Sequence, residues 1–160
     1  MMDVDGVLTT GEIFVDAQGN ESKVFHVHDG SGIIYLHRQG IRTALITGRR
    51  SKAVELRAKE LGIEDVYQGA KDKIRPYEEI RSKRGLTDEE VCYVGDDLLD
   101  LPCLRKAGFP VAVSNATEEV KSVARYVTAR SGGQGAIREV AELILKAQGK
   151  WKSIVDRAGL

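Results

Sequence analysis

The segment Ile41-Arg42-Thr43-Ala44-Leu45-Ile46-Thr47-Gly48-Arg49 has the pattern of a buried strand that ends in a polar turn. A helical pattern follows, in which Val54 and Leu61 lie on one face. Gly62 then stands where a left-handed cap commonly ends a helix. Strand followed by helix is the repeating unit of a parallel sheet.

The same alternation continues along the chain. Further strand-length apolar runs lie at 66–67, 91–94, 111–113 and 126–127. Helical patterns between them stop at Gly85 and Gly108, and a last helix is predicted from Ala136 to about Ala147. We therefore expect an α/β fold with a doubly wound, mostly parallel, Rossmann-like sheet and helices on both faces. Ligands bind such sheets beyond the carboxyl ends of the strands.

One segment interrupts the alternation. Strand-like runs at 12–16 and 22–27 are joined by a short polar stretch, which predicts a β-hairpin over about residues 12–27 that could act as a lid. Nothing in the sequence has the length of a cap domain. We expect residues 1–160 to form a single domain without a cap, with a C-terminal tail over about 146–160.

Composition narrows the kinds of partner. The 160 residues include 24 basic and 24 acidic ones, so the chain lacks the net positive charge that attracts nucleic acid or anionic lipid. A small soluble ligand is the better expectation. Cys92 and Cys103 have no metal-ligand spacing and are interpreted as core residues in a reducing compartment. Without an apolar run of about 20 residues or a signal peptide pattern, the sequence predicts a cytoplasmic protein.

Acidic residues gather in two motifs, each at the end of a hydrophobic run. In Asp3-Val4-Asp5-Gly6, Asp3 is the candidate nucleophile that would form an aspartyl-phosphate. Asp5 would protonate the leaving oxygen and then deprotonate the attacking water. Gly6 would permit a turn that points backbone amides at phosphoryl oxygens.

The other acidic motif is Gly95-Asp96-Asp97-Leu98-Leu99-Asp100. Carboxylates of Asp3, Asp5 and Asp96 are hard oxygen ligands of the kind that Mg²⁺ prefers. Asp97 and Asp100 would orient Asp96 or a water on the metal. Thr47 offers a hydroxyl and Lys73 a compact positive charge to the transferring phosphoryl group.

Each motif alone has a plainer interpretation. The first is compatible with a surface turn, the second with a helix cap, and Lys73 with a solvated helix start. Their order along the chain, each after a strand-like run, favours metal-assisted phosphoryl transfer.

In this order the chain resembles haloacid dehalogenase superfamily phosphatases, whose four motifs match Asp3 with Asp5, Thr47, Lys73, and Asp96 with Asp97. Other segments are similar to the 3-deoxy-D-manno-octulosonate 8-phosphate phosphatases: Lys23-Val24-Phe25, Asp29-Gly30, Asp100-Leu101-Pro102 and Gly132-Gly133-Gln134-Gly135-Ala136. The similarity extends over nearly the whole chain.

The resemblance implies a Mg²⁺-dependent phosphomonoesterase that acts in lipopolysaccharide precursor synthesis. It would hydrolyse the 8-phosphate of 3-deoxy-D-manno-octulosonate through an aspartyl-phosphate. It also implies a capless homotetramer, in which hairpins and C-terminal tails complete neighbouring sites. The substrate contacts that it implies are Gly6, His26, His28, Asp29, Gly30, Gly48, Arg49 and Arg57. An arginine suits a sugar acid because a guanidinium binds a carboxylate with two hydrogen bonds.

Some of these residues have alternatives. Arg57 fits a solvated helix face, and the pattern of residues 25–28 places His26 and His28 on one face of a strand. Family members usually carry asparagine and arginine near these two positions, so a nonulosonate 9-phosphate is an alternative substrate. A phospho-accepting receiver domain and an inactive scaffold are more remote alternatives.

The family also usually has several apolar residues before the first acid, where this chain has Met1-Met2. We therefore expect either that residues precede Met1 in the native protein or that the segment carrying Asp3 is weakly held.

Overall fold

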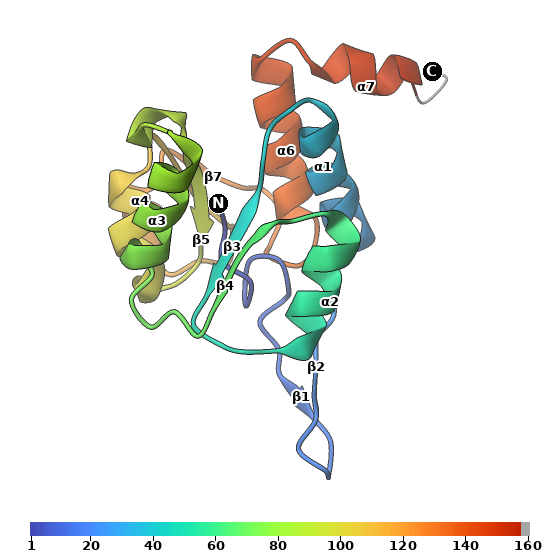
Figure 1. The fold of residues 1–160 in the computed structure, drawn as a ribbon, viewed down its shortest axis with the longest axis vertical. Helices are drawn as coiled ribbons and strands as arrows, with labels where there is room; N and C mark the ends of the chain where they lie inside the picture. The colour runs from blue at the N-terminus through green and yellow to red at the C-terminus, as the bar shows by residue number, and fades with distance from the viewer. Residues whose placement is uncertain (158–160) are drawn as a thin grey trace.

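A parallel sheet runs through the centre of the computed structural model, which describes residues 1–157 (Figure 1). Its strands are β3 (Ala44–Thr47), β4 (Asp65–Gln68), β5 (Cys92–Gly95), β6 (Phe109–Ala112) and β7 (Tyr126–Val127). Met2 forms parallel bridges to Leu45 in β3 and to Val94 in β5. The order across the sheet is therefore β4, β3, the segment of Met2, β5, β6 and β7.

The first three residues are held from both sides. The backbone N–H of Met2 donates to the carbonyl of Ala44 at 3.0 Å, and the N–H of Asp3 donates to that of Val94 at 3.1 Å. The carbonyl of Met2 accepts from the N–H of Ile46 at 3.0 Å. The weak hold that the sequence suggested for Asp3 is absent, because this short segment is paired on two edges at the centre of the sheet.

Helices cover both faces, as predicted. They are α1 (Val27–Arg38), α2 (Lys52–Leu61), α3 (Ile74–Arg84), α4 (Leu101–Lys106), α5 (Glu118–Val123), α6 (Ala136–Ala147) and α7 (Trp151–Arg157), with short 3₁₀ turns η1 (Asp88–Glu90) and η2 (Leu98–Asp100). Helices α1, α2 and α6 lie on one side of the sheet, and α3 and α4 on the other (Figure 1). The predicted doubly wound α/β architecture is confirmed.

Glycine caps end two of the helices where the sequence predicted them. Gly62 and Gly85 have φ angles of 71° and 65°, in the left-handed region that only glycine enters without strain. The prediction for Gly108 was wrong, because α4 ends at Lys106 and Ala107 is already extended. Gly108 instead passes close to the backbone of Glu89, where a Cβ atom would lie 2.5 Å from the Cα.

The hairpin is present but shorter than predicted. Strands β1 (Phe14–Val15) and β2 (Glu21–Ser22) pair antiparallel and project from the body (Figure 1). Beyond β2 an isolated bridge joins Phe25 to Thr9, and α1 begins at Val27. The strand prediction for residues 25–28 was wrong, because this segment turns into a helix that packs on α6. Packing between helices has here overridden a short alternating pattern.

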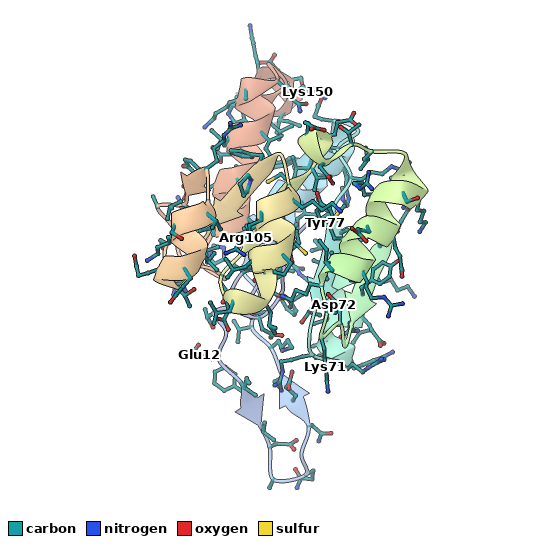
Figure 2. The ribbon with its side chains drawn as sticks, turned by 90° about the vertical axis from the view of Figure 1, so that its left-hand side faces the viewer. Glu12, Lys71, Asp72, Tyr77, Arg105 and Lys150 are labelled. Carbon is teal, nitrogen blue, oxygen red and sulfur yellow. The ribbon has the colours of Figure 1, made fainter. Side chains whose placement is uncertain are left out.

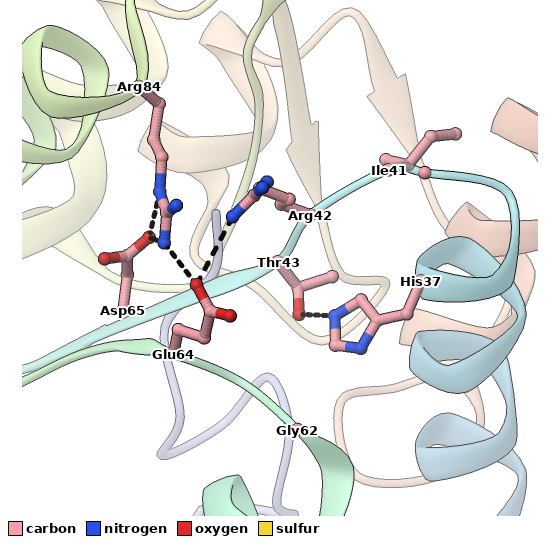
Figure 3. A pocket seen from close by; sticks show the side chains of 9 residues that line it. His37, Ile41, Arg42, Thr43, Gly62, Glu64, Asp65 and Arg84 are labelled. Atoms are coloured by element: carbon pink, nitrogen blue, oxygen red, sulfur yellow. Dashed lines mark hydrogen bonds and ion pairs between the residues drawn. The ribbon is translucent and has the colours of Figure 1, made fainter.

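The two ends of the sheet differ in what surrounds them. Lys71 and Asp72, which precede α3, lie toward the hairpin end with Glu12, and Lys150 lies at the opposite end (Figure 2). The carboxyl ends of the strands therefore face the hairpin. A cavity of about 310 Å³ lies at the other end of β3 and β4 and is lined by charged residues that include Arg42 (Figure 3).

Within residues 1–157, the structure has no helix long and apolar enough to cross a membrane.

Candidate active site

Asp3 and Lys73 form a buried ion pair at the carboxyl end of the sheet. Lys73 Nζ donates to Asp3 Oδ1 at 2.6 Å and to Asp100 Oδ1 at 2.8 Å. The hydroxyl of Tyr93 donates to the same Asp100 oxygen at 2.8 Å. Burial alone would lower the pKa of Lys73, but the two carboxylates outweigh it and raise that pKa. Lys73 is therefore a fixed positive charge beside the candidate nucleophile.

Asp100 also shapes the turn that carries Asp96. Its Oδ2 accepts from the backbone N–H groups of Asp96 at 3.1 Å and Asp97 at 3.4 Å. Gly95 is required there, because a Cβ atom at this position would lie 2.5 Å from the Cβ of Asp100. Asp97 caps η2 by accepting from the N–H of Leu98 at 2.8 Å. Asp97 and Asp100 were expected to orient Asp96 or a water on the metal. In the structure both carboxylates bind backbone N–H groups of this turn, and Asp100 holds the backbone of Asp96 directly.

Three carboxylates converge at this point. Oxygen atoms of Asp3, Asp96 and Asp100 all lie within 4.8 Å of one another. Burial raises the pKa of Asp3 to about 6, although Lys73 opposes the shift. Burial, followed by the charges of Asp3 and Asp100, raises the pKa of Asp96 to about 8. Burial is the main cause of both shifts, and repulsion between the carboxylates adds to them. A hard divalent cation bound here would offset this negative charge.

The sequence predicted the oxygen donors of Asp3, Asp5 and Asp96 as metal ligands. The carboxylate of Asp5 lies outside the cluster of three and has other partners. Lys23 Nζ donates to Asp5 Oδ1, and Thr47 Oγ1 donates to Asp5 Oδ2 at 3.4 Å. Thr47, at the end of β3, is 1% exposed and also accepts from the N–H of Arg49 at 3.3 Å. Asp5 is therefore adjacent to the cluster, with its side chain directed to different groups.

Gly6 brings the first and last motifs into close contact. Its φ angle is 97°, and a Cβ atom there would lie 2.1 Å from Asp96 Oδ2. Glycine is needed both for the backbone conformation and for the approach of that carboxylate. The turn predicted at Gly6 therefore forms one wall of the carboxylate cluster.

Arg49 and the hairpin are joined across the entrance. Arg49, in the turn after β3, donates from Nη2 to Glu21 in β2. Its side chain is 47% exposed, which leaves it accessible to a ligand. Gly48 precedes it, and a Cβ atom there would make an ordinary contact with the carbonyl of Ala70, at 3.8 Å.

The other predicted substrate contacts gather at the start of α1. His26 precedes the helix and His28 lies in its first turn, with their rings 5.2 Å apart. Gly30 faces Arg57 of α2, because a Cβ atom at Gly30 would lie 2.3 Å from Arg57 Nη2. Arg57 lies over the ring of Phe25 at 5.8 Å, and its side chain is 16% exposed. It is therefore partly buried between elements, not on the solvated face that one interpretation expected.

Asp29 has a different environment from the one predicted. It is 0% exposed, and its oxygens accept from the backbone N–H groups of Gly135 at 3.1 Å and Arg138 at 2.8 Å. These contacts are at the start of α6, where a negative charge stabilises a helix. Asp29 thus joins α1 to α6, and its carboxylate is not available to a ligand in this structure.

Sequence reasoning did not assign roles to Lys23, Glu21 or Tyr93. Lys23 and Glu21 lie in a hairpin whose contact with Asp5 depends on the folded chain. Tyr93 lies in an apolar strand, where it resembles an ordinary core residue. A weak signal was available for Lys23, since it belongs to a segment that resembles the family.

Comparison with known proteins agrees with this geometry. Residues 64–139 match the haloacid dehalogenase-like hydrolase family. The chain is 47% identical to the 3-deoxy-D-manno-octulosonate 8-phosphate phosphatase of Yersinia pestis, over 92% of this chain and 79% of that protein. The chain belongs to the 3-deoxy-D-manno-octulosonate 8-phosphate phosphatase family.

Solved structures of this phosphatase family have the same fold. The enzyme from Moraxella catarrhalis, in complex with magnesium, phosphate and KDO, superposes with a TM-score of 0.96 at 45% identity, covering 98% of this chain and 90% of that chain. The cobalt-bound phosphatase from Haemophilus influenzae gives a TM-score of 0.90 at 40% identity, covering 93% and 87%. Membership of this phosphatase family disfavours the receiver domain as an alternative.

Proposed function

We propose that this protein hydrolyses 3-deoxy-D-manno-octulosonate 8-phosphate to the free sugar acid and phosphate, a step in lipopolysaccharide precursor synthesis. The observation that carries the proposal is the buried centre of Asp3, Lys73 and Asp96 in a chain 47% identical to a phosphatase of that name. The centre has a nucleophile, a fixed cation and clustered oxygen donors, which are the parts that phosphoryl transfer requires.

The first half of the reaction uses Asp3 and Asp5. An Asp3 carboxylate oxygen attacks phosphorus as the bond from phosphorus to the sugar oxygen breaks, and this forms an aspartyl-phosphate. Asp5 gives a proton to the departing sugar oxygen. Lys73 donates to Asp3 Oδ1 and so holds the carboxylate in one orientation for attack by its other oxygen.

The second half releases phosphate. Asp5, now a carboxylate, takes a proton from a water molecule that attacks phosphorus, and the bond between Asp3 and phosphorus breaks. The hydroxyl of Thr47 and the backbone of the Gly6 turn lie next to Asp5, where they can donate hydrogen bonds to phosphoryl oxygens. Both aspartates return to their starting states, so the cycle balances.

Asp3 and Asp96 would hold Mg²⁺, since their oxygens converge and their negative charges repel one another. Asp100 would orient Asp96, because its own oxygens already accept from Lys73, from Tyr93 and from the backbone N–H of Asp96. When bound, Mg²⁺ supplies positive charge that offsets the charge on the phosphoryl oxygens. The side chain of Asp5 contacts Lys23 and Thr47 outside the carboxylate cluster, so we assign it to proton transfer and not to the metal.

The sugar acid has a carboxylate that an arginine would bind. Arg49 is the best placed candidate, since its backbone N–H contacts Thr47 at the carboxyl end of β3 and its exposed guanidinium binds Glu21 of the hairpin. A second polar group consists of His26 and His28 at the start of α1 and Arg57 of α2 beside them. We assign this group to the sugar hydroxyls or to the substrate of a neighbouring subunit. Asp29 is omitted from this set, because both its oxygens bind α6.

A phosphate-release assay tests the proposal. Purified protein is incubated with the eight-carbon substrate, with a nonulosonate 9-phosphate and with simple sugar phosphates, each with Mg²⁺ or with a chelator. We expect the largest kcat/KM on the eight-carbon substrate, and loss of turnover in chelator. Preference for the nine-carbon substrate would identify the alternative substrate that His26 and His28 suggested, and the absence of metal-dependent release would refute the phosphatase assignment.

We further propose a homotetramer assembled through the hairpin. Phe14 and Val15 on the projecting hairpin are 51% and 62% exposed, and Ile13 and Val24 beside them are 49% and 58% exposed. Apolar side chains gathered on a projecting element favour burial against another copy. Light scattering should give four times the mass of one chain for the wild type, and a smaller species for Phe14→Ser.

The proposed location is the cytoplasm. A phosphorylated sugar acid carries several negative charges and does not cross a bilayer unaided, so the enzyme would meet its substrate in the compartment that makes it. Cell fractionation with an antibody to the chain tests this assignment, and recovery in the membrane or periplasmic fraction would overturn it.

A further inference from the structure

Lys23 connects the hairpin to Asp5. It follows β2 directly, its side chain is 1% exposed, and its Nζ contacts Asp5 Oδ1 and, at 2.8 Å, Glu21 Oε1. A buried ammonium is costly unless it is paired, so these two carboxylates determine where it lies. Glu21 is held in turn by Arg49 through its other oxygen.

The carboxylate of Asp5 is bound at both oxygens. Lys23 contacts Oδ1, and the hydroxyl of Thr47 lies 3.4 Å from Oδ2. Asp5 itself belongs to a turn after the first strand segment, and its side chain is 18% exposed. Two contacts on opposite oxygens fix the plane of the carboxylate, as proton transfer to a defined atom requires.

We propose that Lys23 is a positioning residue for Asp5, through which the hairpin takes part in protonation of the leaving oxygen. The proposal rests on the proposed function for the roles of Asp3 and Asp5. In the first step the bond between phosphorus and the sugar oxygen breaks, the bond between Asp3 and phosphorus forms, and the Asp5 proton moves to the sugar oxygen. The proton that moves is on Oδ2, since Lys23 contacts Oδ1, and the carboxylate that remains is the form that Lys23 and Thr47 contact in the structure.

The leaving group separates this role from a merely structural one. A sugar alkoxide is strongly basic and leaves slowly without a proton, so its departure depends on Asp5 being in position. A p-nitrophenolate leaves without protonation. Loss of Lys23 should therefore slow transfer from a sugar phosphate far more than transfer from p-nitrophenyl phosphate.

The experiment compares kcat/KM on both substrates, because this parameter covers the steps up to release of the leaving group. For Lys23→Met we expect a fall of about 10²-fold on the sugar phosphate and less than about threefold on p-nitrophenyl phosphate. Lys23→Arg keeps a cation at this position and should recover most of the loss on the sugar phosphate.

Lys52→Met is the matched control, since Lys52 is 77% exposed and pairs with Glu55 on the same helix. It removes the same charge and should leave both values unchanged. If Lys23→Met does not fold, as judged by circular dichroism, the same ratio is measured on Lys23→Gln. Equal losses on the two substrates, or no loss on either, would overturn the proposal.

The failure of the proposed function would look different. Wild-type protein would then not hydrolyse the eight-carbon substrate, and the leaving-group comparison would be made with whichever sugar phosphate the wild type accepts. A selective loss with that substrate would still support the role of Lys23.

Discussion

Lys73 Nζ lies 2.6 Å from Asp3 Oδ1, and both side chains are almost completely removed from water. The two residues are 70 positions apart in sequence, one at the end of the first strand segment and the other at the start of α3. The same ammonium also binds Asp100, so that a single cation is shared by two carboxylates. The contact that stabilises the fold at this point also orients the proposed nucleophile.

Lys73→Met should therefore reduce both activity and stability. Phosphate release is expected to fall by at least about 10²-fold, because a preorganised cation beside the reacting group is lost. The free energy of unfolding is expected to fall by about 3 kcal/mol, because Asp3 and Asp100 are left buried without their partner. Lys71→Met, at an exposed position two residues earlier, is the control and should change neither quantity. Loss of activity with unchanged urea unfolding would show that the pair contributes nothing to the fold.

Asp3→Asn should abolish turnover while the fold persists. Asparagine has the same shape but is far less nucleophilic, and Lys73 keeps Asp100 as a partner. Phosphate release should fall below detection, and the circular dichroism spectrum should stay that of the wild type. The comparison variant is Asp5→Asn, which should still form a phosphoenzyme from p-nitrophenyl phosphate. Near wild-type turnover in Asp3→Asn would contradict the assignment of Asp3 as nucleophile.

Gly6→Ala should weaken the use of Mg²⁺. The new Cβ would lie 2.1 Å from Asp96 Oδ2, so that Asp96 must move away from the carboxylate cluster. We expect the Mg²⁺ concentration for half-maximal activity to rise at least about tenfold, in line with disturbed ligands at other metal sites. Gly40→Ala is the matched control, since Gly40 also has a positive φ angle, 76°, and nothing lies within 4 Å of its Cβ position.

Alanine in left-handed backbone should cost each variant about 1 kcal/mol of stability, and displacement of Asp96 adds to this cost in Gly6→Ala only. The control should keep the Mg²⁺ dependence of the wild type. A shift of equal size in the two variants would mean that backbone strain, not displacement of Asp96, explains the effect.

The parts of the site that the sequence predicted have local signatures. Asp3 follows only Met1-Met2, but the motif Asp3-Val4-Asp5-Gly6 identifies it. Thr47 ends an apolar run and Asp96 follows one after Gly95, so the order of strands and helices is enough to place both at the carboxyl edge. The same holds for the sheet, whose strands have strong local patterns. Lys73 lies at the start of a helix, but its position in the motif order was enough to include it.

The parts that the sequence did not predict depend on contacts between distant segments. Lys23 meets Asp5 because the hairpin folds back over the first turn, and no spacing in the sequence encodes that contact. Asp29 matched a family position but is fully buried against α6, whose N-terminus is 106 positions away. The alternating pattern of residues 25–28 predicted a strand, whereas the packing of α1 on α6 selects a helix.

Asp29→Asn should lower stability and leave substrate affinity unchanged. The amide can replace one of the two acceptor contacts to α6 but removes the negative charge at its N-terminus. We expect a loss of about 1–3 kcal/mol in the free energy of unfolding. Asp156→Asn, at an exposed position in α7, serves as the control. A large increase in KM without loss of stability would instead restore Asp29 as a substrate contact.

Asp65 should make stability dependent on pH at the end of the sheet opposite the active site. Its carboxylate is 4% exposed and accepts from Lys83 at 2.7 Å and from Arg84 at 2.9 Å (Figure 3 shows Arg84). Burial would raise the pKa of Asp65, but the hydrogen bonds from the two basic side chains outweigh it and hold that pKa below its usual range.

A depressed pKa in the folded state stabilises the protein above the unfolded-state value, which is about 3.9 for aspartate, and the contribution is lost as the pH falls through the folded-state value. Wild type should therefore exceed Asp65→Asn by about 1–3 kcal/mol at neutral pH, and the difference should narrow toward about pH 2. Urea unfolding of both proteins at several pH values measures the difference directly. If it stays constant across this range, Asp65 contributes through packing and not through its charge.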